Sequence, residues 1–276
     1  MRFLLLPLLL LLASYSYNVS AFSVTEEPYA SPAILHSKYK SVLAYLNKQG
    51  LRANFKPAME YSDYIAMSKS GMIDMAFASA GLAQLLRQKF GFKLVAASVQ
   101  TLDAVLFVSK QSDFTDLKQL KGHNILIPEA YDIVSEIARD ELIFPLLEKD
   151  DAWVFEQQSK VDHIIYEVLS GREEAGIVAG YDLQLIAHGL QRNVRILYRS
   201  EPVVAHYILL RNLDHFADIQ TWMVNFHQTA FGEQYKKDFG DSRFIVPQPH
   251  HLKELDRFSE FARFLYEQSM EIPSQF

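Results

Sequence analysis

The apolar residues of this chain alternate between two spacings from residue 21 to residue 211. Short apolar runs predict β-strands, and the segments between them have the apolar spacing of amphipathic helices. Strands that alternate with helices in this way are typical of an α/β fold in which helices cover both faces of each sheet. The strands are expected at 21–24, 53–57, 75–78, 94–98, 105–109, 124–127, 153–155, 176–178, 194–197 and 206–211.

The pattern changes after residue 212, where every segment has helical spacing. Helices are predicted at 214–231, 232–239 and 251–270. In the last of them the apolar positions recur on one helical face. These positions are Leu252, Leu255, Phe258, Phe261, Ala262 and Leu265.

One sequence pattern occurs twice, at residues 71–82 and 171–182. In each copy a glycine ends an amphipathic helix, and an acidic residue three positions later (Asp74 or Glu174) leads a short buried strand. Each strand ends in small residues, which allow a ligand to approach the backbone where the carboxyl edge of a sheet opens. Two such edges predict two similar lobes that face each other across a cleft.

Two continuous apolar strands, Val105–Ser109 and His206–Arg211, bracket the middle third of the chain. Such runs are typical of strands that are buried on both faces. No low-complexity linker joins the two halves of the sequence. We therefore expect these two strands to make the crossings between the lobes.

The N-terminus has the pattern of a secretory signal sequence. Arg2 precedes an apolar run that contains Pro7 and ends at Leu12, and a small-residue cleavage pattern follows at 19–21. The apolar run is too short to span a bilayer comfortably. We interpret residues 1–21 as a cleaved signal peptide, with cleavage near residues 14–16 as the alternative. Since the sequence contains no cysteine, neither a lipid anchor on cysteine nor a disulfide is expected. We therefore expect a soluble protein of the periplasm.

Composition narrows the possible functions. The chain has 276 residues, which is enough for two domains of ordinary size. Hydrophobic residues make up 49% and charged residues 22%, which is typical of a globular protein and excludes a disordered one. The formal charge is −6 and the Lys and Arg residues are scattered, so no nucleic-acid partner is expected.

Several motifs give the chain a resemblance to a known family. They are Glu60–Tyr64, the two copies of the repeated pattern, Asp116–Gly122, and Arg199–Pro202 with the segment 209–213. In this order and spacing they resemble the phosphate- and phosphonate-binding periplasmic proteins of ATP-binding-cassette (ABC) importers, over residues 22–231.

The resemblance implies a two-lobed, hinge-closing periplasmic binding fold of type II, built from two mixed sheets. Lobe 1 would comprise residues 22–103 and 206–276, and lobe 2 residues 104–205. The implied function is that of a periplasmic solute-binding protein that closes around a small molecule and presents it to the membrane permease of an ABC importer. The alternatives are a ligand-sensing partner of a membrane signalling protein, such as a sensor kinase, and an exported accessory protein that reuses the fold.

In that family an aromatic residue of the first lobe and a helix N-terminus of the second hold the ligand. Tyr61 stands where the family has a ligand-contacting tyrosine, and its alternative role is packing at a strand-to-helix junction. The family's second aromatic contact falls here on Ala78 or Ser79, so the aromatic contact is lost at this position.

The larger departure follows the strand at 124–127. There the family has a turn rich in serine and threonine that holds an anionic phosphoryl group at a helix start. This chain has Pro128 to Ser135, with a carboxylate at Asp132. Asp132 either contacts the ligand or caps the helix that follows, and both roles remove the phosphate clamp because a capping carboxylate uses the same N–H groups.

Carboxylates and tyrosines recur at the expected edge of the cleft, and no arginine or lysine occurs in its loops. Ring faces and carboxylates suit a cation or a zwitterion. We therefore expect a ligand that carries a positive amine in place of a phosphonate. The candidate ligand-binding residues are Glu27, Tyr61, Ser79, Tyr131, Asp132, Tyr181 and Asp182.

The sequence contains no Gly-x-Gly-x-x-Gly, no phosphate-binding loop, no His-Glu-x-x-His and no Gly-x-Ser-x-Gly. Neither an enzyme nor a cofactor is therefore expected. The pair His250–His251 is interpreted as a polar turn before a helix in preference to a metal site. His163 lies near a position where the family uses a ligand-contacting histidine, with Asp162 as the alternative, and His206 is interpreted as a core histidine.

Overall fold

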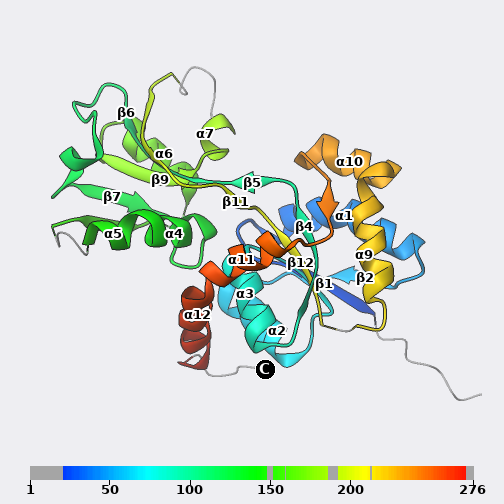
Figure 1. Cartoon of the computed structure of the whole chain (residues 1–276). Helices are drawn as coiled ribbons and strands as arrows, with labels where there is room; N and C mark the ends of the chain where they lie inside the picture. The colour runs from blue at the N-terminus through cyan, green and yellow to red at the C-terminus, as the bar shows by residue number, and fades with distance from the viewer. Residues whose placement is uncertain (1–20, 148–151, 159, 186–191, 212, 272–276) are drawn as a thin grey trace, which may run out of the picture.

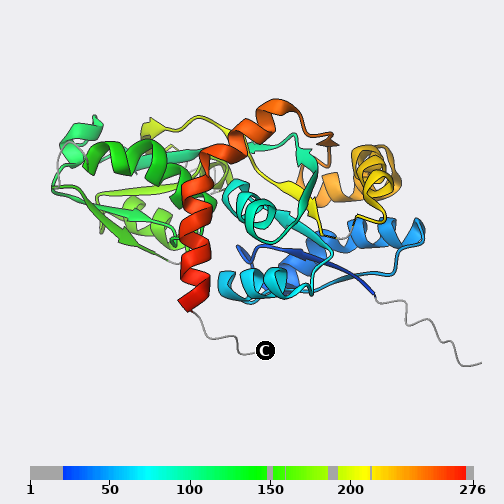
Figure 2. The same ribbon diagram turned by 60° about the horizontal axis from the view of Figure 1, so that its bottom comes forward.

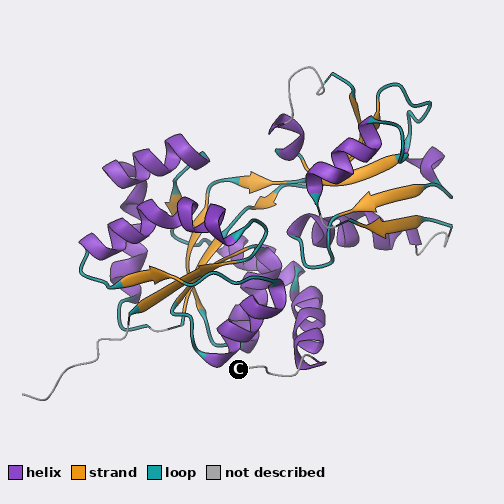
Figure 3. Ribbon diagram, turned by 180° about the vertical axis from the view of Figure 1, so that it is seen from behind, coloured by secondary structure: helices purple, strands orange, loops and turns teal. Residues whose placement is uncertain are grey.

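The computed structural model describes residues 21–147, 152–158, 160–185, 192–211 and 213–271. Its strands form a six-stranded and a five-stranded mixed sheet with a two-stranded ribbon between them (Figure 1). Helices flank each sheet, as the view from behind also shows (Figure 3). The expected α/β fold is therefore confirmed. Residues 1–20, on which the signal-peptide interpretation rests, lie outside the described residues.

The six-stranded sheet has the order β13-β4-β12-β3-β1-β2. Strand β1 runs parallel to β2 and β3, β12 is antiparallel to β3 and β4, and β13 is antiparallel to β4. Segments from the beginning and the end of the chain thus pair within one sheet. The strands are β1 (Phe22–Glu26), β2 (Ala53–Phe55), β3 (Met75–Ala78), β4 (Lys93–Ser98), β12 (Tyr207–Leu210) and β13 (Phe244–Ile245).

The five-stranded sheet is built from the middle of the chain in the order β10-β6-β9-β7-β8. Strand β7 is parallel to β8 and β9, whereas β6 is antiparallel to β9 and β10. The parallel part of this sheet therefore directs the carboxyl ends of β7 and β9 to one edge. The strands are β6 (Ala104–Ser109), β7 (Asn124–Ile127), β8 (Val154–Gln157), β9 (Ala175–Ala179) and β10 (Val194–Arg199).

Alternation along the central strands separates two helix layers. In β3, Met75 and Phe77 belong to a core formed with one group of helices, and Ala76 and Ala78 belong to a second core on the opposite face. The first group is α1 (Pro32–Lys48), α9 (Phe216–Asn225), η3 (Phe226–Gln228) and α10 (Ala230–Phe239). The second is α2 (Tyr61–Ser70), α3 (Ala80–Lys89), α11 (Pro249–Arg257) and α12 (Ser259–Glu271).

The five-stranded sheet is covered in the same way. In β6, Val105 and Phe107 pack with the buried residues of α6, while Leu106 and Val108 join the core that continues into the first sheet. The helical segments here are η1 (Leu117–Leu120), α4 (Ile133–Ala138), η2 (Arg139–Ile143), α5 (Phe144–Leu147), α6 (Val161–Leu169) and α7 (Asp182–Leu185). Within the described ranges, no helix combines the length and the apolar character needed to cross a membrane.

The crossings lie beside the two strands that the sequence singled out. Strand β6 pairs only within the five-stranded sheet and β12 only within the six-stranded sheet, so neither makes a crossing itself. The crossing segments are β5 (Thr101–Leu102) and β11 (Val203–Val204), which pair with each other. The strands β6 and β12 have apolar runs because both of their faces are buried in the sheets. A crossing strand that is buried on both faces would have the same pattern, so the sequence could not tell the two apart. The exact lobe boundaries remain a prediction.

The C-terminal part is not wholly helical, as the sequence had suggested. Strand β13 pairs with β4, and it is too short for its alternation to be visible in the sequence. The predicted helix at 214–231 gives way to η3, after which Thr229 caps α10 by accepting from the Gly232 N–H. The predicted helix at 251–270 is two helices that meet at Phe258, whose buried side chain continues the apolar spacing through the break.

Helix α11 is fastened to the crossing ribbon through Glu254. Its Oε1 atom accepts hydrogen bonds from the Val204 N–H at 3.0 Å and from the Tyr207 hydroxyl at 2.6 Å. Both donors belong to buried residues. Loss of the acceptor would therefore leave buried polar groups without a partner.

We expect the substitution Glu254→Ala to lower the free energy of unfolding by roughly 1–3 kcal/mol, because it leaves the Val204 N–H and the Tyr207 hydroxyl unsatisfied. Equilibrium unfolding in urea measures this change. Glu260→Ala is the matched control, since the Glu260 side chain is 89% exposed and its removal should change stability by about 0.5 kcal/mol or less. Equal effects of the two substitutions would contradict the fastening role of Glu254.

Candidate ligand-binding cleft

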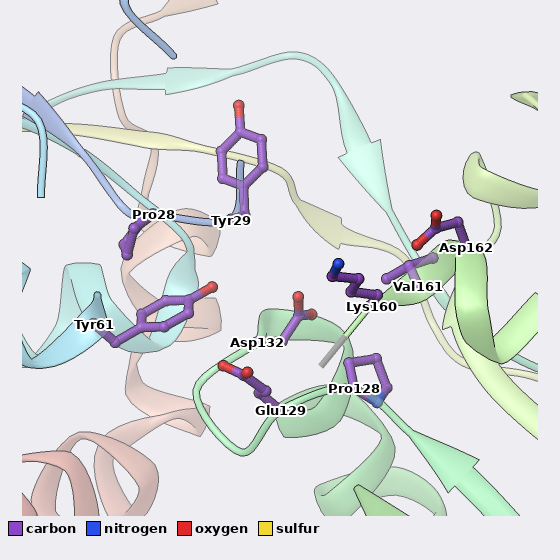
Figure 4. A pocket seen from close by; sticks show the side chains of 9 residues that line it. All are labelled: Pro28, Tyr29, Tyr61, Pro128, Glu129, Asp132, Lys160, Val161 and Asp162. Carbon is purple, nitrogen blue, oxygen red and sulfur yellow. The ribbon is translucent and has the colours of Figure 1, made fainter. Parts of the chain in front are cut away.

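Two adjoining cavities lie between the two sheets. The larger has a volume of about 640 Å³ and the smaller, shown in Figure 4, about 300 Å³. Tyr29, Tyr61, Asp132 and Val161 line both of them. These volumes lie in the range of about 300–1,000 Å³ that is usual for small-molecule sites.

Segments that follow strands of both sheets form the cleft. Glu27 and Tyr29 follow β1, while Asp132 lies in the loop after β7 and Tyr181 and Asp182 come directly after β9. Because β7 and β9 are parallel, their following loops meet at the same edge of the sheet. The sheet topology therefore brings together side chains that are far apart in the sequence.

Five of the seven candidate residues line a cavity: Glu27, Tyr61, Asp132, Tyr181 and Asp182. Each of the other two, Tyr131 and Ser79, contacts one of these five. Tyr131 stacks on Tyr61, with ring centroids 5.6 Å apart and ring planes 20° apart. Ser79 is buried and binds Glu27. Tyr61 thus fits both roles considered for it. It packs at the junction between a strand and a helix, where it is 9% exposed, and it also lines the cleft.

Glu27 is a buried carboxyl group held at the wall of the larger cavity. It is 4% exposed, and its Oε2 atom accepts from the Ser79 N–H at 3.2 Å and from the Ser79 hydroxyl at 2.8 Å. Burial raises the pKa of Glu27 to about 8, against the opposing effect of these hydrogen bonds, and the nearby carboxylates of Glu26 and Asp132 add to the increase. Glu27 is therefore largely protonated at neutral pH in the empty cleft.

Asp132 caps helix α4 and also faces the cleft. Its Oδ1 atom accepts from the Val134 N–H at 2.8 Å, which confirms the capping role expected from the sequence. The next hydroxyl in the helix, that of Ser135, is buried and donates to the Pro128 carbonyl at 2.7 Å. Burial raises the pKa of Asp132 to about 6, and the Glu129 carboxylate acts in the same direction. The Val134 N–H and the Ser135 hydroxyl, two donors at this helix start, are thus bound within the protein.

Asp182 begins helix α7 on the same side of the cleft. Burial raises its pKa to about 7, and repulsion from Asp132 adds to the increase. Tyr181, which is 49% exposed, extends the wall of the larger cavity beside it. Glu27, Asp132 and Asp182 thus place three carboxyl groups with raised pKa values around one cavity.

Two basic residues of the larger cavity, Lys38 and His206, were not recognised from the sequence. The Lys38 ammonium lies 3.2 Å from Glu26 Oε1 and 2.5 Å from the Tyr29 hydroxyl, and His206 Nε2 lies 3.0 Å from the same Glu26 oxygen. Burial opposes the ionisation of Glu26, but Lys38 and His206 outweigh it and lower its pKa. The sequence suggested that His206 is a core histidine. It does bind the buried Glu26, but it also lines the cavity. Lys38 comes from the middle of α1, where no local motif marks it.

The smaller cavity has a mixed charge. Glu129, Asp162 and Lys160 line it together with Asp132 (Figure 4). Of the two alternatives weighed in the sequence, Asp162 faces the cleft, whereas His163 pairs with Glu167 at 2.8 Å. No group of His, Asp and Glu residues in the described part of the chain has the arrangement of a metal site.

Residues 24–252 match the sequence family described as the periplasmic substrate-binding protein of phosphonate ABC transporters. Comparison with curated proteins gave no match. The fold is similar to XAC2383 from Xanthomonas citri bound to chloride, with a TM-score of 0.74 and 15% identity over 90% of this chain and 99% of that one. It is also similar to PhnD1 from Prochlorococcus marinus in complex with methylphosphonate, with a TM-score of 0.71 and 14% identity over 90% and 98%.

A third similar structure is the binding protein PA3383 of an ABC phosphonate transporter from Pseudomonas aeruginosa. Its TM-score is 0.72 and its identity 13%, over 90% of this chain and 88% of that one. At such low identities these likenesses establish the fold, which is the expected type II periplasmic binding fold.

The raised pKa of Glu27 predicts that the carboxyl group destabilises the protein at alkaline pH. The pKa of Glu27 is higher in the folded protein than in the unfolded chain, so ionisation of this carboxyl group favours unfolding. The resulting loss of folding free energy begins above the ordinary pKa of 4.5 and is complete above about pH 8. We expect Glu27→Gln to be more stable than the parent protein at the upper end of this range, by roughly 1–3 kcal/mol. The difference should vanish toward the lower end.

Urea unfolding of both proteins across this pH range measures the effect. Glu260→Gln is the control, because Glu260 is exposed and should show no comparable pH-dependent gain. A Glu27→Gln protein that is less stable than the parent throughout would show that Ser79 stabilises the ionised carboxylate.

Proposed function

The chain belongs to the periplasmic substrate-binding proteins of phosphonate ABC transporters, and within that family we propose that its cleft binds a small organic cation, an amine or a zwitterion, in place of a phosphonate. As a member of this family it is the solute-binding component of an importer and works with a membrane permease. The proposal concerns the ligand and the residues that recognise it.

The convergence of Glu27, Asp132 and Asp182 on one cavity carries the proposal. Burial makes ionisation of each carboxyl group unfavourable, and ionisation of all three together is less favourable still because like charges repel. A bound cation reverses both effects, since it supplies an opposite charge near these carboxyl groups, whereas the Lys38 ammonium in the wall of the cavity is paired with Glu26. An anionic ligand would instead add to the repulsion.

The start of α4 supports the same conclusion. A phosphonate needs free N–H and hydroxyl donors, such as a helix N-terminus provides. Here Asp132 accepts from the Val134 N–H, and the Ser135 hydroxyl donates to Pro128. A phosphonate would have to displace a carboxylate from its own capping position.

Aromatic side chains provide the remaining walls. Tyr29, Tyr61 and Tyr181 all line the larger cavity. Ring faces attract ammonium groups, and methylene chains pack against them without loss of hydrogen bonds. A cavity of tyrosines and carboxylates therefore suits a ligand with an amine on a short carbon chain.

The same residues couple binding to closure of the cleft. Glu27 and Tyr61 follow strands of the six-stranded sheet, whereas Asp132 and Asp182 follow strands of the five-stranded sheet. A cation that contacts both sets at once stabilises the closed arrangement, because only that arrangement provides all of the contacts. The closed protein is then the form that the permease receives.

We expect hexylamine to bind and methylphosphonate not to bind, with affinity for hexylamine rising as the pH increases from about 5.5 to 8.5. The ammonium group requires ionised carboxylates, and the pKa values of Asp132, Asp182 and Glu27 in the empty cleft are about 6, 7 and 8. Binding at neutral pH should therefore release protons. Isothermal titration calorimetry in buffers of different ionisation enthalpy measures both the affinity and the protons released.

Asp182→Asn removes one of these carboxylates without changing the size of the side chain. It should weaken hexylamine binding by about tenfold or more and reduce the proton release, whereas Glu260→Gln should change neither. Binding of methylphosphonate, or an amine affinity that is independent of pH, would contradict the proposed function.

A further inference from the structure

Lys160 stands out among the basic residues of the cleft. Its side chain extends into the smaller cavity, toward the space that Asp132 and the Tyr61 hydroxyl also face (Figure 4). Lys38 and His206 are both bound to Glu26. Among the described residues that line either cavity, Lys160 is the one cation without an ion-pair partner.

The backbone beside Lys160 is also electropositive, because it is the N-terminus of a helix. Lys160 is the N-cap residue of α6, and its side chain makes no capping hydrogen bond. Val161 and Asp162 begin the helix, and the first N–H groups of a helix have no partner within it. An ammonium group at a helix start, on the wall of a cavity of about 300 Å³, favours a negative group on the ligand.

The other residues of the smaller cavity restrict that negative group to one end of a larger ligand. Glu129, Asp132 and Asp162 contribute carboxylates to the same cavity, so a free anion would be repelled from it. A ligand that also carries an ammonium group offsets this repulsion. Tyr29, Tyr61 and Asp132 line both cavities, so one molecule can extend from the larger cavity into the smaller.

We propose that Lys160 is a specificity residue that binds the carboxylate of a linear zwitterion, whose ammonium group lies in the larger cavity near Glu27 and Asp182. The inference rests on the proposed function, since it assumes that the larger cavity binds a cation. It narrows the ligand class from amines in general to amino acids whose two charged groups are separated by a carbon chain. Simple monoamines bind less tightly because they leave Lys160 without a partner.

Calorimetric titration with ε-aminocaproate, hexylamine and hexanediamine tests the inference, because the three probes share one chain length and differ in their second end. We expect ε-aminocaproate to bind about tenfold more tightly than hexylamine, and hexanediamine to bind no better than hexylamine, since its second ammonium group meets Lys160. Lys160→Gln should remove the advantage of ε-aminocaproate over hexylamine. Lys253→Gln, at an exposed position of α11, is the matched control.

The outcomes separate the two proposals. Binding of hexylamine with no advantage for ε-aminocaproate, or an equal loss of both in Lys160→Gln, would overturn the role of Lys160 and leave the proposed function intact. Tighter binding of hexanediamine than of ε-aminocaproate would do the same. Failure of all three amines to bind would overturn the proposed function and this inference with it.

Discussion

Two adjacent glutamates at the end of β1 determine the chemistry of this cleft. Glu26 is the last residue of β1 and Glu27 follows it, and the two side chains have different partners. Glu26 contacts Lys38 and His206, which lower its pKa, whereas Glu27 accepts from the N–H and the hydroxyl of Ser79 and has a raised pKa. The Lys38 ammonium is thereby paired within the protein. Glu27, Asp132 and Asp182 line the larger cavity, and burial raises the pKa of each of these carboxyl groups.

The two lobes also touch behind the cleft, through the C-terminal helices. Helix α12 runs between the lobes (Figure 2), and the Arg139 guanidinium lies 5.4 Å and 5.6 Å from the ring centres of Phe261 and Phe264. Arg257 of α11 pairs with Glu141 at 2.7 Å.

At the same contact the Glu136 carboxyl packs directly on Gly81 of α3, so closely that a Cβ at Gly81 would overlap it. Burial raises the pKa of Glu136, and neither of its oxygens has a hydrogen-bond partner in the described structure.

The sequence predicted the parts of this protein that depend on local spacing. The strands β3 and β7 were predicted with their observed bounds, and the cap at Asp132 follows from the residue type before an apolar helix. The residues that the sequence did not indicate are those that reach the cleft by tertiary packing. Lys38 lies 12 residues from Glu26 on a helix with no motif, and His206 directly precedes β12, which β3 separates from β1 in the sheet. Their spacing along the chain carries no signal, because the contact exists only after the sheet has formed.

The family of this protein therefore does not by itself identify its ligand. The fold depends on apolar alternation over the whole chain, which survives at 13–15% identity. Under the proposed function, ligand recognition depends on a few groups at strand ends, and Asp132 at the start of α4 is the group that disfavours a phosphonate. Helix α4 has six residues, so a capping carboxylate contributes about 1 kcal/mol to a short and otherwise weak helix. The same hydrogen bond occupies the Val134 N–H, so under the proposed function the interaction that stabilises α4 also disfavours an anionic ligand at this helix start.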